Sequence, residues 1–283
     1  MRCGSCRSVF QDITAGQFAA LHDRAQDDHF VESSVTYQGS EPATAIWNAL
    51  SLSGTSLLEI GPGTGHLLAA ARNAGLQVAG VETNQIHRAY IDQAWGIDDV
   101  YASIDAVPDG QVFENIVAIN VLEHVYDVSS FLRSMTRVLA PHGVFHVSTT
   151  NAESLEAAVL RNWWSMCKEI DHVSFPSPIG IGRAARVAGL RVERVWSGEL
   201  PLEFPVSVLV AARDWTRSRR PATGAVGLPE APSASVTSRQ RLARLYGLGA
   251  HLDPTSRMLG AMGRAASVRA RLRLAEPADP GGP

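Results

Sequence analysis

The sequence predicts an α/β fold: a doubly wound, Rossmann-like sheet of seven strands that is mostly parallel and has an antiparallel last strand. Between residues 56 and 150, short apolar runs alternate with amphipathic stretches, which is typical of a parallel sheet with right-handed helical crossovers. The run at residues 113–119 is almost continuously apolar, as expected for a strand buried on both faces. A glycine-rich turn follows the first apolar run, where folds of this class bind nucleotides.

Five strands and three helices are expected in this region. The strands are placed at residues 57–60, 77–82, 100–101, 113–119 and 144–148. The helices are placed at residues 66–73, 84–94 and 128–140, with Gly75 and Gly96 as stop signals for the first two and Pro141-His142-Gly143 closing the third.

The sheet is expected to end in an antiparallel hairpin. Residues 190–196 give a sixth strand after a helix at 179–188. Residues 268–274 alternate strictly between apolar side chains and arginine, as a seventh strand would. The sequence also allows residues 206–211 to be the seventh strand, with everything after them a tail. We favour the first arrangement, which makes residues 201–266 an insertion before the last strand.

The chain therefore divides into five parts. Ser40-Glu41-Pro42 predicts the start of a helix before the first strand, which gives the sheet an N-terminal helical cover. Residues 219–238 are rich in Pro, Ala, Gly and Ser and are typical of a mobile linker. The parts are a partial Cys-x-x-Cys ribbon remnant (1–10), the helical cover (11–55), the core (56–200), a helical and flexible insertion (201–266), and the last strand with a disordered C-terminus (267–283).

Composition narrows the class of protein. With 283 residues, of which 45% are hydrophobic, the chain can bury a sizeable core. Its apolar runs are too short to span a bilayer, and the N-terminus lacks the apolar stretch of a secretory signal. We therefore expect a cytoplasmic protein without an integral membrane segment.

The net charge of −3 is unevenly distributed. Residues 1–210 have a net charge of −10, whereas residues 211–283 have a net charge of +7. Nucleic-acid binding requires a basic face, so we expect no nucleic-acid partner for the acidic body. The arginine-rich tail fits a solvated segment better than a surface for an anionic partner.

Cys3 and Cys6 form a Cys-x-x-Cys pair, and the chain has three cysteines in all, too few for a disulfide framework. Such a pair supplies half of the ligands of a tetrahedral zinc site. His22 and His29 stand at no familiar ligand spacing and Cys167 is remote. We therefore expect no bound metal.

The glycine-rich turn contains Gly61, Gly63 and Gly65, and Glu59 precedes it by two residues. Glycines let the backbone turn tightly and approach a ligand closely. Dinucleotide sites use G-x-G-x-x-G, but His66 stands where the third of those glycines would be. The pattern G-x-G-x-G alone fits either a nucleotide site or an ordinary tight turn.

Glu82 ends the predicted second strand, 21 residues after Gly61. A carboxylate at this place accepts hydrogen bonds from the ribose hydroxyls of an adenosine group. This role serves NAD and S-adenosylmethionine (SAM) equally, so Glu82 indicates a ribose-bearing cofactor without selecting one.

Two further blocks select the cofactor. Asn120-Val121-Leu122-Glu123-His124-Val125 follows the fourth strand, and Arg137-Val138-Leu139-Ala140-Pro141-His142-Gly143 precedes the fifth. At their spacing these blocks resemble those of class I SAM-dependent methyltransferases that act on small molecules, such as the ubiquinone-type and natural-product enzymes. The resemblance covers about residues 30–200. His142 departs from it, because the family usually has glycine there. The Met1–Phe10 segment is similar to the second half of a zinc ribbon found in some of these enzymes.

The resemblance implies SAM as cofactor and assigns residues to its parts. Glu59 and the three glycines match the loop at the methionine end, and Glu82 matches the acid that binds the ribose. The other residues that the family would place at the cofactor are Thr83 and Asn84 beside the adenine, Ile104 and Asp105 at the adenine, Asn120 near the methyl donor, and Tyr37 in the pocket. Tyr37 fits simple packing equally well.

His172 and His124 are the expected catalytic residues. A histidine is the natural general base at neutral pH, although methyl transfer can proceed by positioning of the nucleophile alone. Trp163, Trp164 and Phe175 would hold the acceptor. The function implied is transfer of a methyl group to a small-molecule acceptor, with oxygen as the favoured atom. The alternatives are C- or N-methylation of a sugar or natural product, a nicotinamide-dependent oxidoreductase, and a non-catalytic SAM-binding protein. A homodimer is left open.

Overall fold

The computed structural model describes residues 1–24, 50, 52–169, 171–198, 208–209, 211–213, 215–216 and 254–275. Tyr37, the helix expected to start at Ser40 and most of the expected insertion lie outside the described residues. All statements below refer to the described part of the chain.

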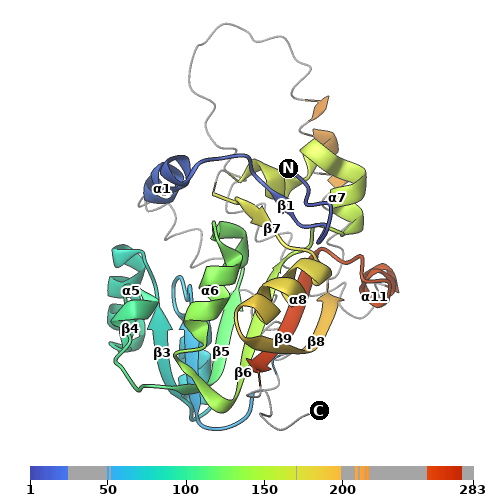
Figure 1. Cartoon of the computed structure of the whole chain (residues 1–283). Coiled ribbons are helices and arrows are strands. Elements are labelled where there is room, and N and C mark those ends of the chain that lie inside the picture. Colours follow the sequence, from blue (N-terminus) through green and yellow to red (C-terminus); the bar gives the residue numbers. More distant parts are fainter. Residues whose placement is uncertain are drawn as a thin grey trace, which may run out of the picture.

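A seven-stranded sheet forms the centre of the molecule, in the order β4-β3-β2-β5-β6-β9-β8 (Figure 1). Neighbouring strands from β4 to β6 are parallel, and β9 is antiparallel to both of its neighbours. The fold class predicted from the sequence is thereby confirmed. The strands are β2 (Ser56–Ile60), β3 (Gln77–Val81), β4 (Val100–Tyr101), β5 (Phe113–Ile119), β6 (Leu139–Thr150), β8 (Leu190–Gly198) and β9 (Ser267–Leu274).

The last strand lies where the alternating sequence predicted it. β9 inserts between β6 and β8, and Val268, Ala270 and Leu272 are buried while the arginines between them are partly exposed. This alternation matches the two faces of a strand. Because β9 fills the place beside β6, the alternative assignment of residues 206–211 as the seventh strand is wrong.

Helices connect the parallel strands and cover the sheet. Asn84 caps α5 (Gln85–Trp95) by accepting from the backbone amides of Ile86 and His87, and Asp127 caps α6 (Val128–Met135) through Ser130. Figure 1 shows α6 and α8 on the same face of the sheet. The other helices are α1 (Ala15–Arg24), α4 (His66–Asn73), α7 (Leu155–Leu160), α8 (Pro178–Val187) and α11 (Pro254–Ala261), with short 3₁₀ turns η1 (Ile104–Ala106), η2 (Leu122–His124), η3 (Arg161–Trp163) and η4 (Ser165–Lys168).

One helix ends earlier than its sequence predicted. The expected helix at 128–140 stops at Met135, and Pro141-His142-Gly143 belongs to β6 rather than to a helix stop. Val138 accepts a hydrogen bond from the Phe113 amide at 2.8 Å, and Leu139 pairs with Phe113. Leu139 is apolar and fits a helix face or a strand, so pairing with β5 decides its state.

The N-terminal residues form a small second sheet. β1 (Val9–Phe10) pairs antiparallel with β7 (Ser174–Phe175), and the Ser177 hydroxyl donates to the Cys6 carbonyl. Figure 1 shows this pair above the carboxyl ends of the parallel strands. The N-terminal segment is therefore fixed to the stretch that carries His172.

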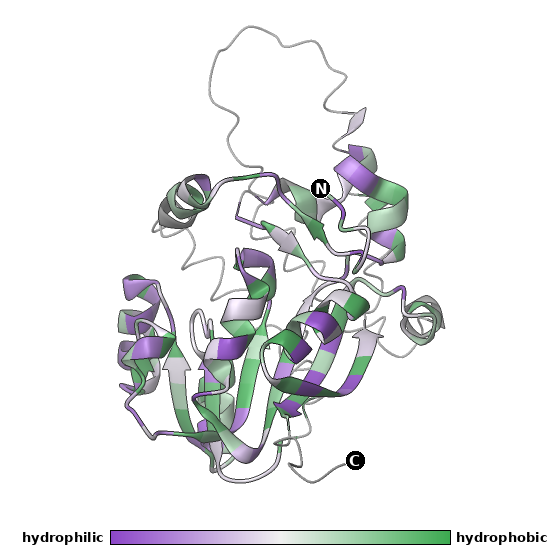
Figure 2. Cartoon of the chain, viewed as in Figure 1, coloured by the Kyte–Doolittle hydropathy of each residue, from purple (hydrophilic) through white to green (hydrophobic). Residues whose placement is uncertain are grey.

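Apolar residues are concentrated on the sheet (Figure 2). Leu58, Ile116, Phe145 and Leu272 are fully buried in one cluster that spans β2, β5, β6 and β9. None of the helices in the described part of the chain is long and apolar enough to cross a membrane.

Candidate active site

Most of the predicted cofactor residues meet at one edge of the sheet. Glu59 lies in β2, Glu82 directly follows β3, and Asn120 directly follows β5. Because β2, β3 and β5 are parallel, their carboxyl ends lie at the same edge. Ligands of open α/β sheets bind at this edge, and the strands on either side of β2 supply the predicted residues.

The glycine turn between β2 and α4 requires glycine for two reasons. Gly61, Gly63 and Gly65 all have positive φ, at 67°, 55° and 76°, a region that other residues rarely adopt. A Cβ atom on Gly61 would lie 2.9 Å from the Val121 side chain, and one on Gly65 would lie 2.8 Å from Ile91. The turn is thus packed closely against the loop after β5 and against α5.

Glu82 holds the glycine turn in place. Its Oε2 accepts from the Gly63 amide and its Oε1 accepts from the Asn84 amide, both at 2.9 Å. The Nδ1 atom of His87 lies 3.8 Å from Oε2. A carboxylate has about four acceptor positions, so each oxygen keeps capacity for a further donor such as a ribose hydroxyl.

Glu59 is buried at the same edge. Burial and the neighbouring charge of Glu82 raise the pKa of Glu59 to about 8. The hydrogen bond from the Leu68 amide acts in the opposite direction and is outweighed. The Oε2 atom of Glu59 has no hydrogen-bond partner among the described residues. A buried, unpartnered carboxyl oxygen at a strand end is a suitable acceptor for a polar or cationic ligand group.

The residues expected near the adenine differ in their surroundings. The side chain of Thr83 is exposed, whereas Asn84 is buried and uses its side-chain oxygen to cap α5. Ile104 and Asp105 lie in η1 after β4, with Asp105 exposed and the Ile104 carbonyl bound by Arg137. A ligand at this place would therefore meet the side chains of Thr83 and Asp105 rather than that of Asn84.

Asn120 adopts a strained backbone at the end of β5. Its φ is +54°, and its amide donates to the Ser148 carbonyl at 2.8 Å. Such conformations in residues other than glycine are concentrated at functional sites. Asn120 thus lies at the carboxyl end of β5, and its expected place near the methyl donor stays a prediction.

The two predicted catalytic histidines lie next to each other. Their ring centroids are 4.7 Å apart with nearly perpendicular planes. His124 Nδ1 lies 3.1 Å from the Asp171 carboxylate, and His172 Nδ1 lies 3.1 Å from the Met166 carbonyl. Gln11 holds the His172 backbone through a 2.7 Å hydrogen bond to its carbonyl.

The surroundings push the pKa values of the two histidines in opposite directions. Burial and the adjacent His124 lower the pKa of His172 to about 4, so its ring is neutral at pH 7. Burial also acts to lower the pKa of His124, but the hydrogen bond to Asp171 and the charge of Glu123 outweigh it and raise that pKa. Pairs of groups whose pKa values are pushed apart are typical of acid–base sites.

Sequence reasoning missed Asp171 and Glu123 as members of this cluster. Glu123 is buried behind the histidines and accepts from the Thr149 hydroxyl at 2.6 Å, and burial raises its pKa. One donor atom from each of Glu123, His124 and His172 lies within 4.8 Å of the others, so these three residues could hold a metal ion. Asp171 directly precedes His172, which was the available signal in the sequence. Its partner, His124, is remote in sequence, so their contact could not be predicted.

The aromatic residues expected at the acceptor pack partly against the protein itself. Trp164 and Phe175 are buried with their rings 5.5 Å apart, and Phe175 also faces the His172 ring at 6.3 Å. Trp164 Nε1 donates to Glu156 at 3.1 Å. Trp163 is partly exposed. Packing therefore accounts for Trp164, while Phe175 faces one of the two histidines, His172.

The chain is similar to known methyltransferases over its central part. A family model described as a methyltransferase domain matches residues 29–195. Among curated proteins, the ubiquinone biosynthesis O-methyltransferase of Bradyrhizobium diazoefficiens is 32% identical over 124 residues, which cover 42% of this chain and 46% of that protein. The protein of the same name from a Methylobacterium species is 30% identical over 154 residues, covering 50% and 61%. The chain thus spans about half the length of the curated relatives it matches.

Solved structures share the fold. A SAM-dependent methyltransferase from Archaeoglobus fulgidus matches with a TM-score of 0.55 and 12% identity, covering 87% of this chain and 99% of that chain. A SAM-dependent methyltransferase from Thermotoga maritima, described as a possible histamine N-methyltransferase, matches with a TM-score of 0.54 and 14% identity, covering 92% of this chain and 99% of that chain. At these identities the likeness concerns the fold alone.

Proposed function

The chain belongs to the methyltransferase domain family, and from this premise we propose that it transfers a methyl group from SAM to an oxygen atom of a small-molecule acceptor. The observation that carries the proposal is the meeting of the glycine turn, Glu59 and Glu82 at one sheet edge, with a strained Asn120 beside them. The curated relatives named above are O-methyltransferases, which supports oxygen as the acceptor atom.

The chain's own residues fit SAM at this edge. The positive-φ glycines leave room where side chains would collide, and Glu82 keeps acceptor capacity toward ribose hydroxyls. The unpartnered Glu59 Oε2 would face the amino group of the methionine part. Thr83, Asn84, Ile104 and Asp105 would surround the adenine, as the family resemblance implies. When bound, SAM supplies a methyl carbon that is made electrophilic by its sulfonium.

His124 is the residue we assign as general base. A hydroxyl acceptor would give its proton to His124 while its oxygen takes the methyl group that SAM supplies, with S-adenosylhomocysteine as the leaving group. The pKa of His124 is raised toward the range in which a base works well at neutral pH, whereas that of His172 is too low. Asp171 fixes the His124 ring through its Nδ1 atom and stabilises the charge that forms. His172, neutral and bound to the Met166 carbonyl, supports the ring of His124.

The other functions considered have less support. A nicotinamide-dependent oxidoreductase would use a third glycine at the place of His66, which instead packs edge-on against Trp95 with ring centroids 5.2 Å apart. Transfer to carbon or nitrogen would use the same cofactor edge but would not need the Asp171–His124 pair as a base for a hydroxyl. A non-catalytic SAM-binding protein would have no need of the strained backbone of Asn120 or of the Asp171–His124 pair.

Calorimetry with S-adenosylhomocysteine and NADH tests the cofactor. We expect S-adenosylhomocysteine to bind and NADH not to bind, and the opposite result would overturn the proposal. A screen of phenols, alcohols and amines with SAM labelled in its methyl group then tests the acceptor atom, with label on oxygen as the expected outcome. The proposal also includes a cytoplasmic location and no nucleic-acid partner, the latter because residues 1–210 carry a net charge of −10. Light scattering decides between a monomer and a homodimer.

A further inference from the structure

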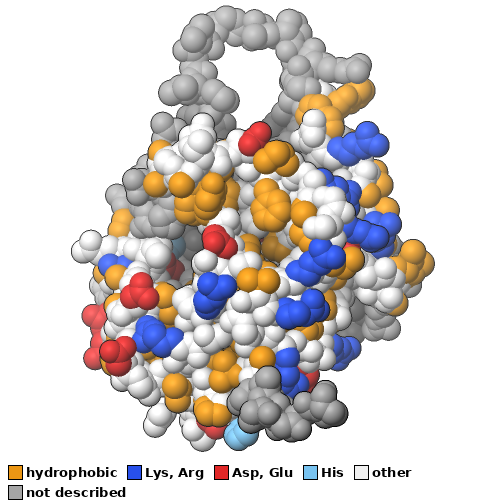
Figure 3. Space-filling model, in the orientation of Figure 1, with side chains coloured by type: hydrophobic (Ala, Val, Ile, Leu, Met, Phe, Trp, Pro, Cys, Tyr) orange, Lys and Arg blue, Asp and Glu red, His pale blue; other side chains and the backbone are white. Residues whose placement is uncertain are grey.

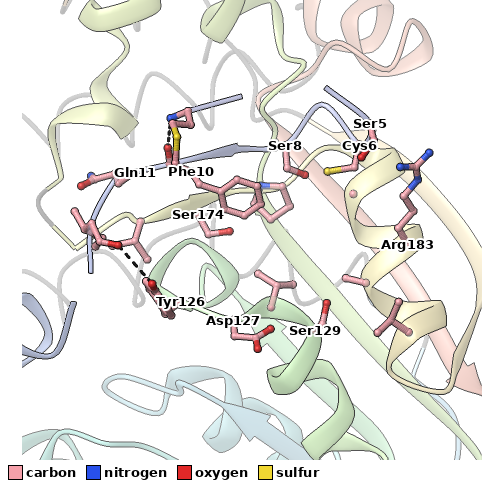
Figure 4. Close-up of a pocket in the computed structure, with 18 of the residues that line it drawn as sticks. Ser5, Cys6, Ser8, Phe10, Gln11, Tyr126, Asp127, Ser129, Ser174 and Arg183 are labelled. Carbon is pink, nitrogen blue, oxygen red and sulfur yellow. Dashed lines mark hydrogen bonds between the residues drawn. The ribbon is translucent and has the colours of Figure 1, made fainter. Parts of the chain in front are cut away.

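A cavity of 590 Å³ lies between the N-terminal segment, the start of α6 and the first turns of α8. Its volume is within the range of about 300–1,000 Å³ that is typical of small-molecule sites. None of the residues assigned above to the cofactor lines it, and neither does either histidine, whereas Gln11, which holds the His172 backbone, does. Figure 4 shows Phe10 on its upper side and Asp127 and Ser129 on its lower side.

The walls of the cavity are mostly apolar. Phe10, Ile13, Val128, Val173 and Val187 contribute to them from four different segments of the chain. Figure 3 shows hydrophobic side chains gathered over this part of the face, with arginine side chains beside them over α8. Such walls favour the hydrocarbon part of a ligand.

Ser174 supplies a polar group inside this apolar space. Ser174 is 1% exposed, and its hydroxyl has no hydrogen-bond partner among the described residues. Figure 4 shows that hydroxyl between the Phe10 ring and the start of α6. Buried hydroxyls in proteins are nearly always hydrogen-bonded, so a ligand group that reaches Ser174 would complete the missing bond.

The charged residues of the cavity lie at its rim. Asp12, Asp127 and Arg183 are all exposed, and Asp127 is already engaged in capping α6 through the Ser130 amide. No charged side chain among the described lining residues is buried. A charged ligand would therefore lose its hydration without a buried counter-charge, which favours a neutral one.

We propose that this cavity binds a neutral, mainly apolar small molecule that carries one hydroxyl or carbonyl group, which hydrogen-bonds to Ser174. Val173 lies in the cavity wall and directly follows His172, and its amide donates to the Glu123 carbonyl at 2.8 Å. The cavity therefore adjoins the histidine cluster without including it. The molecule is either the methyl acceptor or a ligand that is not methylated, and both have this chemistry. Binding does not depend on methyl transfer, so the proposal stands or fails separately from the proposed function.

The test uses the full chain with three probes: 2-naphthol, naphthalene and 2-naphthoate. Ligand-observed NMR titration should show that 2-naphthol binds more tightly than naphthalene, which lacks the hydroxyl, and than 2-naphthoate, which is charged. In Ser174→Ala the affinity for 2-naphthol should fall about five-fold, the value of one neutral hydrogen bond, while that for naphthalene stays the same. Tighter binding of 2-naphthoate, or of all three equally, would overturn the assignment.

Two matched pairs of variants place the ligand. Thr150 also has a buried, unpartnered hydroxyl but does not line the cavity, so Thr150→Val should leave 2-naphthol binding unchanged. Ser129→Trp fills the cavity and should abolish binding, whereas Val159→Trp on the exposed side of α7 should not. Circular dichroism checks folding. If Ser129→Trp fails to fold, the Ser174→Ala comparison decides alone, and unchanged 2-naphthol affinity there rejects the proposal.

Adding SAM with a labelled methyl group separates the two sources of the ligand. Labelled 2-methoxynaphthalene whose formation drops in Ser174→Ala identifies the cavity as part of the acceptor site. Specific binding of 2-naphthol with no labelled product identifies a ligand that is not methylated. Either result supports the cavity as a site, and the absence of Ser174-dependent binding at millimolar probe rejects it.

Discussion

The carboxylate of Glu82 accepts a hydrogen bond from the backbone amide of Gly63 at 2.9 Å, so the end of β3 holds the turn that follows β2. This bond places one acid in two roles, as a support for the glycine turn and as a proposed partner of the ribose. In Glu82→Gln the side chain would present an NH₂ group to one of two backbone amides. We expect the affinity for S-adenosylhomocysteine, measured by calorimetry, to fall at least ten-fold, because one of the two amides loses its acceptor.

Glu193→Gln is the control for this change. Glu193 lies in β8, remote from the glycine turn, and pairs with Arg271 and Arg273 at the surface. Its replacement should leave the affinity unchanged. Equal affinities in wild type and Glu82→Gln would remove Glu82 from the cofactor site.

Asp171→Asn should change the pH dependence of methyl transfer. A base works in its neutral form, so activity rises with pH through the pKa of His124, which lies above its ordinary value of 6.5 because of Asp171 and Glu123. Without the charge of Asp171 that pKa falls, and the rising limb of kcat/KM moves to lower pH. The plateau should drop about ten-fold or more, because an amide does not fix the His124 tautomer or stabilise its charge as the carboxylate does.

The exposed Asp98 serves as the matched control for this profile. Asp98→Asn should leave both the limb and the plateau as they are in wild type. If Asp171→Asn lowers the plateau of kcat/KM but does not move its rising limb, Asp171 supports the local structure and does not set the pKa of His124.

The two histidines should separate in alanine variants. His124→Ala removes the proposed base, and we expect kcat to fall by about 10²-fold with loss of the pH-dependent limb. His172→Ala removes a neutral neighbour, so kcat should fall less and the limb should remain. The reverse pattern, with the limb lost only in His172→Ala, would make His172 the base. Rates measured at saturating SAM keep cofactor binding out of the comparison.

Local patterns were sufficient to predict most of the sheet. The period of two in residues 268–274 and the continuous apolar run of β5 each predict a strand without any long-range information. The reason is that burial on one face or on both decides which side chains a strand tolerates. The end of α6 was missed because Leu139 is compatible with helix and strand, and its pairing with Phe113 is a long-range contact. The β1–β7 pair was missed for the same reason.

The site was predictable where residues follow strands directly. Glu59 lies near the end of β2, and the glycines and Glu82 follow β2 and β3, so spacing alone places them at the sheet edge. Asp171 was not found because its contact with His124 depends on how β7 folds back over η2, where the Val173 amide donates to the Glu123 carbonyl. The residue types at the histidine pair were visible in the sequence, but their mutual distance was not.

Gly61→Ala should destabilise the turn and weaken cofactor binding. The added Cβ would meet the Val121 side chain at 2.9 Å, and the residue would be held at a φ of +67°. We expect a loss of about 1–3 kcal/mol in the free energy of unfolding, measured by urea denaturation. Gly75→Ala has a positive φ but no atom within 4 Å of its Cβ, so it isolates the cost of backbone strain from the cost of the collision. Equal losses would mean that the contact with Val121 costs nothing.

Glu59→Gln should stabilise the protein at alkaline pH. The pKa of Glu59 is about 8 in the folded chain and 4.5 ordinarily, so between these values the folded state holds a proton that the unfolded state has released. Stability from this group is therefore complete below pH 4.5 and is lost as pH rises toward 8. Glutamine stays neutral throughout, and we expect it to gain about 1–3 kcal/mol at pH 8 and nothing at pH 4.

The same carboxyl group predicts a proton exchange on cofactor binding. If a cationic part of SAM meets Glu59, the carboxyl ionises and releases its proton, because a neighbouring positive charge lowers the pKa of an acid. Calorimetry at pH 7 in buffers with different ionisation enthalpies should then show proton release in wild type and less release in Glu59→Gln. Equal release in the two proteins, together with equal affinity for S-adenosylhomocysteine, would mean that the unpartnered Oε2 of Glu59 does not face the cofactor.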